Sequence, residues 1–171
     1  MINNRAGIKT THVPYKSGVS AQLGLLGNRG VMDTPFNQTS YTAQKVQNQQ
    51  ATTVFDALAD DPSVRLRSAD GNVNGASATM RGFFTSPADT LYGGLYGVLP
   101  YYSVNAEVAE RIEVLKGPSA MLDGMVLGGG IGGSINIVPK RAPEEPLAQF
   151  TASYASNSLF RGHADLGQRF G

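Results

Sequence analysis

The chain has 171 residues, enough for one domain with a hydrophobic core, and only 16% of them are charged, which excludes a strongly charged disordered tail. The formal net charge of +1 gives no overall basic field that would attract nucleic acid. Cysteine is absent, which excludes disulfides, thiol nucleophiles and cysteine-ligated metals, and His12 and His163 lie at opposite ends of the sequence. No run approaches the ~18 apolar residues that a membrane-spanning helix needs.

The N-terminal segment, residues 1–30, mixes small, polar and glycine residues without a clear period, and we expect it to be extended or mobile. Its first residues lack the apolar stretch of a secretory signal peptide. Either the protein stays inside the cell, or the sequence is a piece of a longer protein.

The region after residue 31 begins with one clear helical pattern. Ala51, Val54 and Leu58 recur at the spacing of one helix face. Pro62 ends this helix because proline disfavours helical geometry in the residue before it. In chain order, the expected elements are a short strand with a turn over 38–46, a helix over 50–59, a strand over 64–66 and a loop over 68–75.

Glycine and proline break the second half into short strand patterns. Asn105 is a residue type that caps helices, Gly124 is a typical helix stop, and Pro139 ends the last strand. The expected elements are strands over 78–83, 90–98, 111–115 and 134–138, a helix over 105–110 and a helical turn over 117–122. Because strands and helices mix without a strict βαβ rhythm, we assign the chain to the α+β class.

The glycine-rich run Gly128–Gly133 matches the pattern G-x-G-x-x-G of dinucleotide-binding proteins. That site needs a strand before the run and a helix after it, so that the pyrophosphate meets the N-terminus of the helix. Here a helical turn comes before the run and a β-rich segment after it. We therefore favour a tight turn between closely packed backbones over a nucleotide site.

The last 25 residues alternate in a different way. Two segments of about ten residues, joined by a short polar turn, carry apolar or small side chains on one face and both signs of charge on the other. This is the pattern of an outer-membrane β-barrel hairpin. An amphipathic hairpin on a soluble sheet has the same pattern. The apolar or small face comprises Phe150, Ala152, Tyr154, Phe160, Gly162, Ala164 and Leu166.

Six sequence motifs occur together in one order, at residues 33–37, 56–58, 61–65, 80–83, 110–120 and 129–141. They include Met80-Arg81-Gly82-Phe83 and the segment Glu110-Arg111-Ile112-Glu113-Val114-Leu115-Lys116-Gly117-Pro118. In this order and spacing they resemble the plug domain of a TonB-dependent outer-membrane siderophore receptor of the ferrichrome-receptor type.

The resemblance implies a compact plug with a small mixed β-sheet and short helices, lodged inside a roughly 22-stranded transmembrane barrel. It divides the chain into an N-terminal segment (1–30), a plug domain (31–146) and the first hairpin of a truncated barrel (147–171). Residues 1–30 contain no convincing TonB box, the family's segment for coupling to TonB. We therefore expect a fragment of the full receptor.

The resemblance also implies where the ligand binds. The three apical loops of the plug fall at 67–74, 85–89 and 100–103, and they supply hydrogen bonds and aromatic surface rather than metal ligands, because the siderophore itself saturates the iron. Tyr102 occupies the position of a ligand-contacting tyrosine. The expected siderophore-binding residues are Arg67, Pro87, Ala88, Tyr101 and Tyr102.

Two basic residues, Arg81 and Lys116, fall where the family places cations that pair with barrel glutamates. Without a barrel, these side chains would face solvent or local carboxylates. Lysine at 116 keeps the charge of the commoner arginine but loses its bidentate fork. Asp123 stands where many members have tyrosine. The doublets Asp60-Asp61 and Glu144-Glu145 flank prolines, and we expect solvated turns there.

The expected function is therefore gating and ligand binding in a receptor that imports a ferric siderophore, of hydroxamate type. The expected partners are the ferric siderophore, the chain's own barrel, TonB with ExbB and ExbD, and the outer membrane of a Gram-negative bacterium, with no nucleic acid. We expect no cofactor, no metal site, no catalytic residue and no enzyme activity. The alternatives are the plug of a heme or vitamin B12 receptor, or a small nucleotide-binding enzyme that uses the glycine run.

Overall fold

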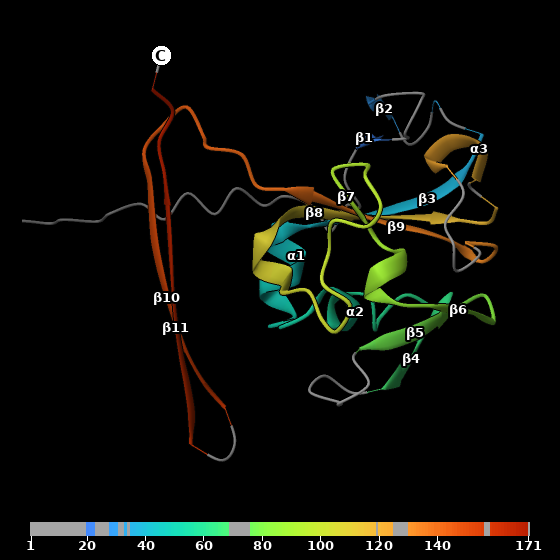
Figure 1. The fold of residues 1–171 in the computed structure, drawn as a ribbon. Helices are drawn as coiled ribbons and strands as arrows, with labels where there is room; N and C mark the ends of the chain where they lie inside the picture. Colours follow the sequence, from blue (N-terminus) through green and yellow to red (C-terminus); the bar gives the residue numbers. More distant parts are fainter. Residues whose placement is uncertain are drawn as a thin grey trace, which may run out of the picture.

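The computed structural model describes most of the chain after residue 35 and three short pieces before it (Figure 1). The described residues are 20–22, 28–30, 33, 35–68, 76–118, 120–124, 130–155 and 158–170. Within residues 1–30, where we expected extended or mobile chain, the described residues form a small antiparallel pair of strands, β1 (Ser20–Gln22) and β2 (Asn28–Gly30). The rest of this segment, including His12, lies outside the described residues.

A mixed four-stranded sheet forms the centre of the plug, in the order β3-β8-β9-β7. The long strand β8 pairs antiparallel with both β3 and β9, and the short β7 pairs parallel with β9. The mixed sheet that the sequence predicted is therefore confirmed. The strands are β3 (Asn37–Thr42), β7 (Leu91–Tyr92), β8 (Ala109–Lys116) and β9 (Gly133–Pro139).

Two short helices, α1 (Ala43–Asn48) and α2 (Val54–Ala57), lie where the sequence predicted a turn and one longer helix. The side chains of Thr42 and Thr53 accept hydrogen bonds from the first turns and set both helix starts. Asp56 completes a capping box with Thr53. The predicted helix over 50–59 was thus too long, because the cap at Thr53 shortens it from the N-terminal side.

A second, three-stranded sheet contains β4 (Val64–Ser68), β5 (Ser77–Met80) and β6 (Phe83–Thr85). The strand predicted over 78–83 is in fact a hairpin. Arg81 and Gly82 have φ angles of 52° and 88°, which suit a two-residue turn between antiparallel strands.

The segment between the two sheets is mostly irregular. The strand predicted over 90–98 is reduced to β7, because Gly93, Gly94 and Gly97 all have positive φ angles. The predicted helix from Asn105 is a single 3-10 turn, η4 (Ala106–Val108), without a side-chain cap. A second 3-10 turn, η3 (Pro87–Asp89), lies between β6 and β7.

The glycine run leads into a strand, not into a helix. The predicted turn before it is α3 (Ala120–Asp123), which ends at Gly124 with a φ angle of 83°. A side chain at Gly132 would overlap the carbonyl oxygen of Met80, and one at Gly133 would overlap that of Leu115. This confirms closely packed backbones at these two glycines, and the strand β9 that follows removes the basis for a nucleotide site.

The core lies between the central sheet, α2 and the second sheet. Leu58, Ile112 and Ile137 are fully buried, as are Val114 and Met80. Burial of such side chains is the main favourable term in folding. The plug part of the chain thus has a hydrophobic core of its own.

The C-terminal hairpin consists of β10 (Leu147–Ala155) and β11 (Leu159–Gly167) and stands beside the plug, next to α1 (Figure 1). Its register pairs Phe150 with Ala164 and Tyr154 with Phe160, so the apolar residues share one face, as predicted. Phe150 and Tyr154 are 75% and 74% exposed on that face. The opposite face looks toward the plug.

Candidate ligand-binding surface

The start of β5 lies beside the third predicted apical loop. The amide of Ala76, just before β5, donates a hydrogen bond of 2.8 Å to the carbonyl oxygen of Tyr102. Of the first predicted loop, residues 69–74 lie outside the described residues. In Figure 1, β4 and β5 lie toward the same end of the molecule as the end of β10 and the start of β11, and α3 with β1 and β2 lies at the other end.

Tyr101 and Tyr102 form an exposed aromatic pair at this end. Their rings are 62% and 61% exposed, and they pack edge to face with centroids 5.5 Å apart and planes at 89°. This geometry is favourable for two aromatic rings and leaves both hydroxyl groups available to a ligand. The structure thus brings together the two tyrosines that the resemblance selected.

Arg67 lies in β4 and is exposed, with its guanidinium carbon 5.5 Å above the ring centroid of Phe84. A cation at this distance is attracted by the ring face. Phe84 itself was not selected from the sequence. The Phe83-Phe84 doublet in a short strand was the available signal, since adjacent strand residues point to opposite faces and both rings are exposed.

The second predicted loop is folded onto the core rather than raised above it. Pro87 begins η3 and is less than 2% exposed, and Ala88 is half-buried. Asp89 accepts hydrogen bonds from both the amide and the hydroxyl of Ser86, which close this turn. The placement of Pro87 argues against a ligand contact through its side chain.

Asp61 is the main correction to the predicted polar sites. We expected a solvated turn, but its side chain is buried, with 2% of the residue exposed, and accepts hydrogen bonds from Tyr41 (2.8 Å) and from the amide and hydroxyl of Ser63 (2.9 and 2.6 Å). Lys116 Nζ lies 2.9–3.0 Å from both carboxylate oxygens. Burial by itself raises the pKa of Asp61, but the bonds from Ser63, Lys116 and Tyr41 outweigh it and lower this pKa to about 2.

The two predicted barrel-contact residues therefore differ. Lys116 is paired with Asp61 inside the plug. Arg81 is exposed, its guanidinium lies beside Gly117, and it makes no ion pair with any residue in the described part of the chain. The single negative charge of Asp61 is already paired with Lys116, and no ion pair joins it to Arg81. Only Arg81 keeps its charge available for a carboxylate elsewhere.

Further buried polar contacts tie the strands and turns of the central sheet together. Asn136 donates to Glu113 at 2.9 Å and accepts from the amide of Gly94 at 3.0 Å, which ties the turn after β7 to β8 and β9. Asp123 accepts a hydrogen bond from Ser134. Burial, together with the negative charges of Asp123 and Asp89, raises the pKa of Tyr96 to about 12.

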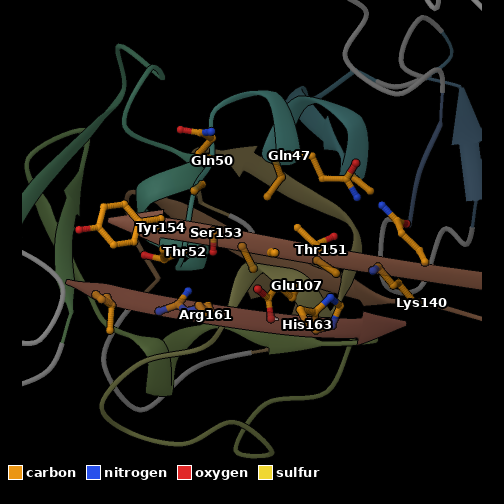
Figure 2. Close-up of a pocket in the computed structure, with 18 residues that line it drawn as sticks. Gln47, Gln50, Thr52, Glu107, Lys140, Thr151, Ser153, Tyr154, Arg161 and His163 are labelled. Atoms are coloured by element: carbon orange, nitrogen blue, oxygen red, sulfur yellow. Dashed lines mark ion pairs between the residues drawn. The ribbon is translucent and has the colours of Figure 1, made fainter. Parts of the chain in front are cut away.

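A cavity of about 540 Å³ lies between the plug and the hairpin (Figure 2). Gln47 and Gln50 reach it from the α1 side, and Thr151, Ser153 and the hairpin's other inward residues reach it from β10 and β11. Two polar contacts link the plug to the hairpin here. Lys140 Nζ lies 2.6 Å from Asp165 Oδ2, and His163 Nε2 lies 3.9 Å from Glu107 Oε2.

Neither a metal site nor a membrane-spanning helix is found in the part of the chain that the structure describes. No cluster of three or more histidine, aspartate or glutamate side chains among these residues is placed to hold a metal ion. No described helix is long and apolar enough to cross a membrane.

Residues 30–133 match the family described as TonB-dependent Receptor Plug Domain. The chain belongs to this family. Its resemblance to plug domains, given above on six motifs, is thereby confirmed, and so are the α+β plug fold and its place in the outer membrane of Gram-negative bacteria.

Relatives and solved structures agree with this assignment. The chain is 38% identical to the ferrichrome receptor FcuA of Yersinia enterocolitica, over 98% of this chain and 22% of that protein, and 32% identical to the catecholate siderophore receptor Fiu of Escherichia coli K12, over 84% and 19%. The crystal structure of BauA, the ferric preacinetobactin receptor of Acinetobacter baumannii, superposes with a TM-score of 0.85 at 40% identity, covering 91% of this chain and 23% of that one. The chain thus spans about a fifth of the length of these relatives, which are named as receptors and not as enzymes.

Proposed function

We propose that the chain supplies the plug and first barrel hairpin of a receptor that imports a ferric siderophore, with residues 31–146 as the plug and 147–171 as the start of the barrel. The observation that carries this proposal is the exposed Tyr101–Tyr102 pair, and the exposed Arg67–Phe84 contact supports it. Aromatic rings and a guanidinium suit an oxygen-rich chelate with apolar spacers. FcuA, the relative named for ferrichrome, supports a hydroxamate siderophore as the ligand.

The two faces of the hairpin support a place in a barrel wall. Phe150 and Tyr154 present an apolar surface suited to lipid, and the polar face is turned to the plug. Arg81 then binds a carboxylate of the barrel, as the resemblance implies, and Lys116 stays with Asp61. TonB, driven with ExbB and ExbD, supplies the energy for release of the ligand inward.

The test uses the full receptor in cells that lack other siderophore receptors. We expect saturable binding of ⁵⁵Fe-ferrichrome without energy, and uptake only when TonB is present. Iron chelated by a catecholate siderophore, hemin and vitamin B12 serve as competitors. Competition by hemin or vitamin B12 but not by any ferric siderophore would replace this proposal with one of the two alternative receptors.

Two variants locate the site. Tyr102→Ala is expected to raise the Kd by about tenfold, because it removes an aromatic contact at the centre of the surface. Phe150→Ala is the control, since that ring is also largely exposed (75%) but lies on the hairpin, outside the residues that line the cavity. Equal effects of the two substitutions would contradict the proposed site.

A further inference from the structure

The second sheet has one face in the core and one face open to solvent. Ala78 and Met80 of β5 are buried on the inner side. The register places Arg65 of β4 opposite Thr79 of β5, and Thr79 opposite Phe84 of β6, so these three side chains share the outer face. Arg65 and Phe84 are both exposed there.

Arg67 is held on the same outer face by two features of the sheet. The register shifts between Leu66 and Ser68, so Arg67 occupies a β-bulge. The hydroxyl of Ser68 accepts a hydrogen bond of 2.9 Å from the amide of Ser77 and lies 3.0 Å from the hydroxyl of Ser77, which fixes the strand directly after the bulge. The guanidinium of Arg67 then lies over the ring of Phe84, 5.5 Å from its centroid. A ring attracts a cation without neutralising it, so Arg67 keeps its full charge.

Neither arginine has a counter-charge on this face. Arg65 and Arg67 make no ion pair with any residue in the described part of the chain. The strands β4, β5 and β6 contain no aspartate or glutamate. Two like charges that share a face attract an anion, and a guanidinium matches a carboxylate through two parallel hydrogen bonds. The outer face is thus suited to a ligand that carries carboxylates.

The Arg67 end of this sheet adjoins the loop that carries the exposed tyrosine pair. Arg67 precedes Ser68, and Ser68 pairs with Ser77. Ser77 follows Ala76, whose amide donates a hydrogen bond to the carbonyl oxygen of Tyr102. The sheet lies at the end of the molecule away from α3 (Figure 1). A chelate bound at the tyrosines would therefore have the arginine-bearing face beside it.

We propose that the outer face of the second sheet selects ferric chelates by their charge. Arg65 and Arg67 bind carboxylates at the periphery of the chelate, and Phe84 is a positioning residue that holds the guanidinium of Arg67 over the sheet. The proposal rests on the proposed function and adds to it the charge of the preferred ligand. The ligand class is a ferric hydroxamate with carboxylates that take no part in binding iron and so remain available to the arginines.

The first experiment compares two chelates on the full receptor in cells. ⁵⁵Fe-ferrichrome is neutral, and ⁵⁵Fe-ferrichrome A is a related ferric hydroxamate whose acyl groups carry carboxylates. The measured quantity is the Kd for ferrichrome divided by the Kd for ferrichrome A. Arg65→Gln should lower this ratio by about tenfold, because it removes a charge-assisted contact that only the carboxylates make. Arg141→Gln is the matched control, since it removes the same charge from an exposed residue between β9 and β10, and should leave the ratio within about twofold.

Salt and charge reversal separate an electrostatic effect from a change in shape. Raising the salt concentration should lower the ratio for the wild type more than for Arg65→Gln, because salt screens exposed charges. Arg65→Glu should lower the ratio further than Arg65→Gln and leave the Kd for ferrichrome within about twofold. A ratio that does not respond to salt, or equal ratios for Arg65→Gln and Arg65→Glu, would contradict selection by charge.

The positioning role of Phe84 is tested through Arg67. Phe84→Leu should lower the ratio by about threefold, whereas Phe84→Trp keeps a ring face and should retain the wild-type ratio. When Arg67→Gln is already present, Phe84→Leu should have no further effect. Phe83→Leu is the matched control, since that ring is also exposed but points to the opposite face of β6. An equal effect of Phe84→Leu with and without Arg67 would show that Phe84 does not act through it.

The outcomes separate the two proposals. If the receptor binds ferrichrome but not ferrichrome A, or if Arg65→Gln leaves the ratio of the wild type unchanged, selection by charge is wrong and the proposed function stands. A receptor that binds and imports no ferric chelate refutes the proposed function, and selection by charge with it.

Discussion

The plug and the hairpin of this chain use alternating strands in opposite ways. In β8 and β9 the apolar residues Ile112, Val114 and Ile137 point into a core and are fully buried. In β10 and β11 the apolar residues Phe150 and Phe160 are 75% and 70% exposed. The comparison shows that alternation predicts a strand with two unlike faces, but the surroundings decide which face is covered.

The glycines of the two regions differ in the same way. Gly133 fits against the backbone of Leu115 and has a φ angle of 143°, whereas a side chain at Gly162 would meet only the ring of Phe150 at 3.8 Å. The plug depends on close internal packing. The hairpin leaves its outward face for partners outside the chain.

The largest loss of stability is expected when a methyl group is added at Gly133, the closely packed glycine of the plug. Gly133→Ala should lower the free energy of unfolding by about 3 kcal/mol or more, because the new Cβ overlaps backbone and the φ angle is unfavourable for alanine. Gly162→Ala should change it by less than about 0.5 kcal/mol. Urea unfolding of the chain in detergent measures both, and similar effects would remove the contrast between the regions.

Truncation of apolar side chains tests the same difference in packing between the plug and the hairpin. Ile137→Ala leaves a cavity in the core and should cost about 2–5 kcal/mol. Phe160→Ala removes a larger but exposed side chain and should cost less than about 1 kcal/mol in the same unfolding measurement. A larger loss for Phe160→Ala would mean that the hairpin packs inward.

The buried carboxylate makes the plug sensitive to acid. The pKa of Asp61 is about 2 in the folded chain and near 3.8 without its contacts, so it contributes roughly 2 kcal/mol of stability above pH 4. This contribution is lost as the pH falls from about 4 to 2. Asp61→Asn should therefore be destabilised at pH 7 but approach the wild type near pH 2. A difference that does not vary with pH would contradict the ionised Asp61–Lys116 pair.

The smallest loss of stability is expected at the contact between the plug and the hairpin. Lys140→Gln removes the ion pair with Asp165, whose side chains are both partly exposed, and should cost less than about 1 kcal/mol. Raising the salt concentration should reduce the difference from the wild type further, because salt screens exposed charges. A loss as large as that of Ile137→Ala would show a tightly fixed hairpin.

Much of the fold was predictable from local patterns. The order of six motifs identified the plug domain, and strand patterns over 111–115, 134–138 and the hairpin correspond to β8, β9 and β10–β11. The two exposed tyrosines were selected by their position in the family pattern. The errors lie where a turn or a cap decides the structure, as at Arg81-Gly82 within a predicted strand and at Thr53 within a predicted helix.

The sequence by itself determined the family and the two-faced character of the hairpin, because both depend on residue order over short distances. Only the tertiary structure showed that Asp61 is buried, that Lys116, 55 residues away, neutralises it, and that a cavity lies between the hairpin and α1. These features arise from contacts between distant segments. From local composition alone, a charged residue next to a proline is expected to lie in solvent. Only the folded chain shows which distant hydrogen-bond donors surround it.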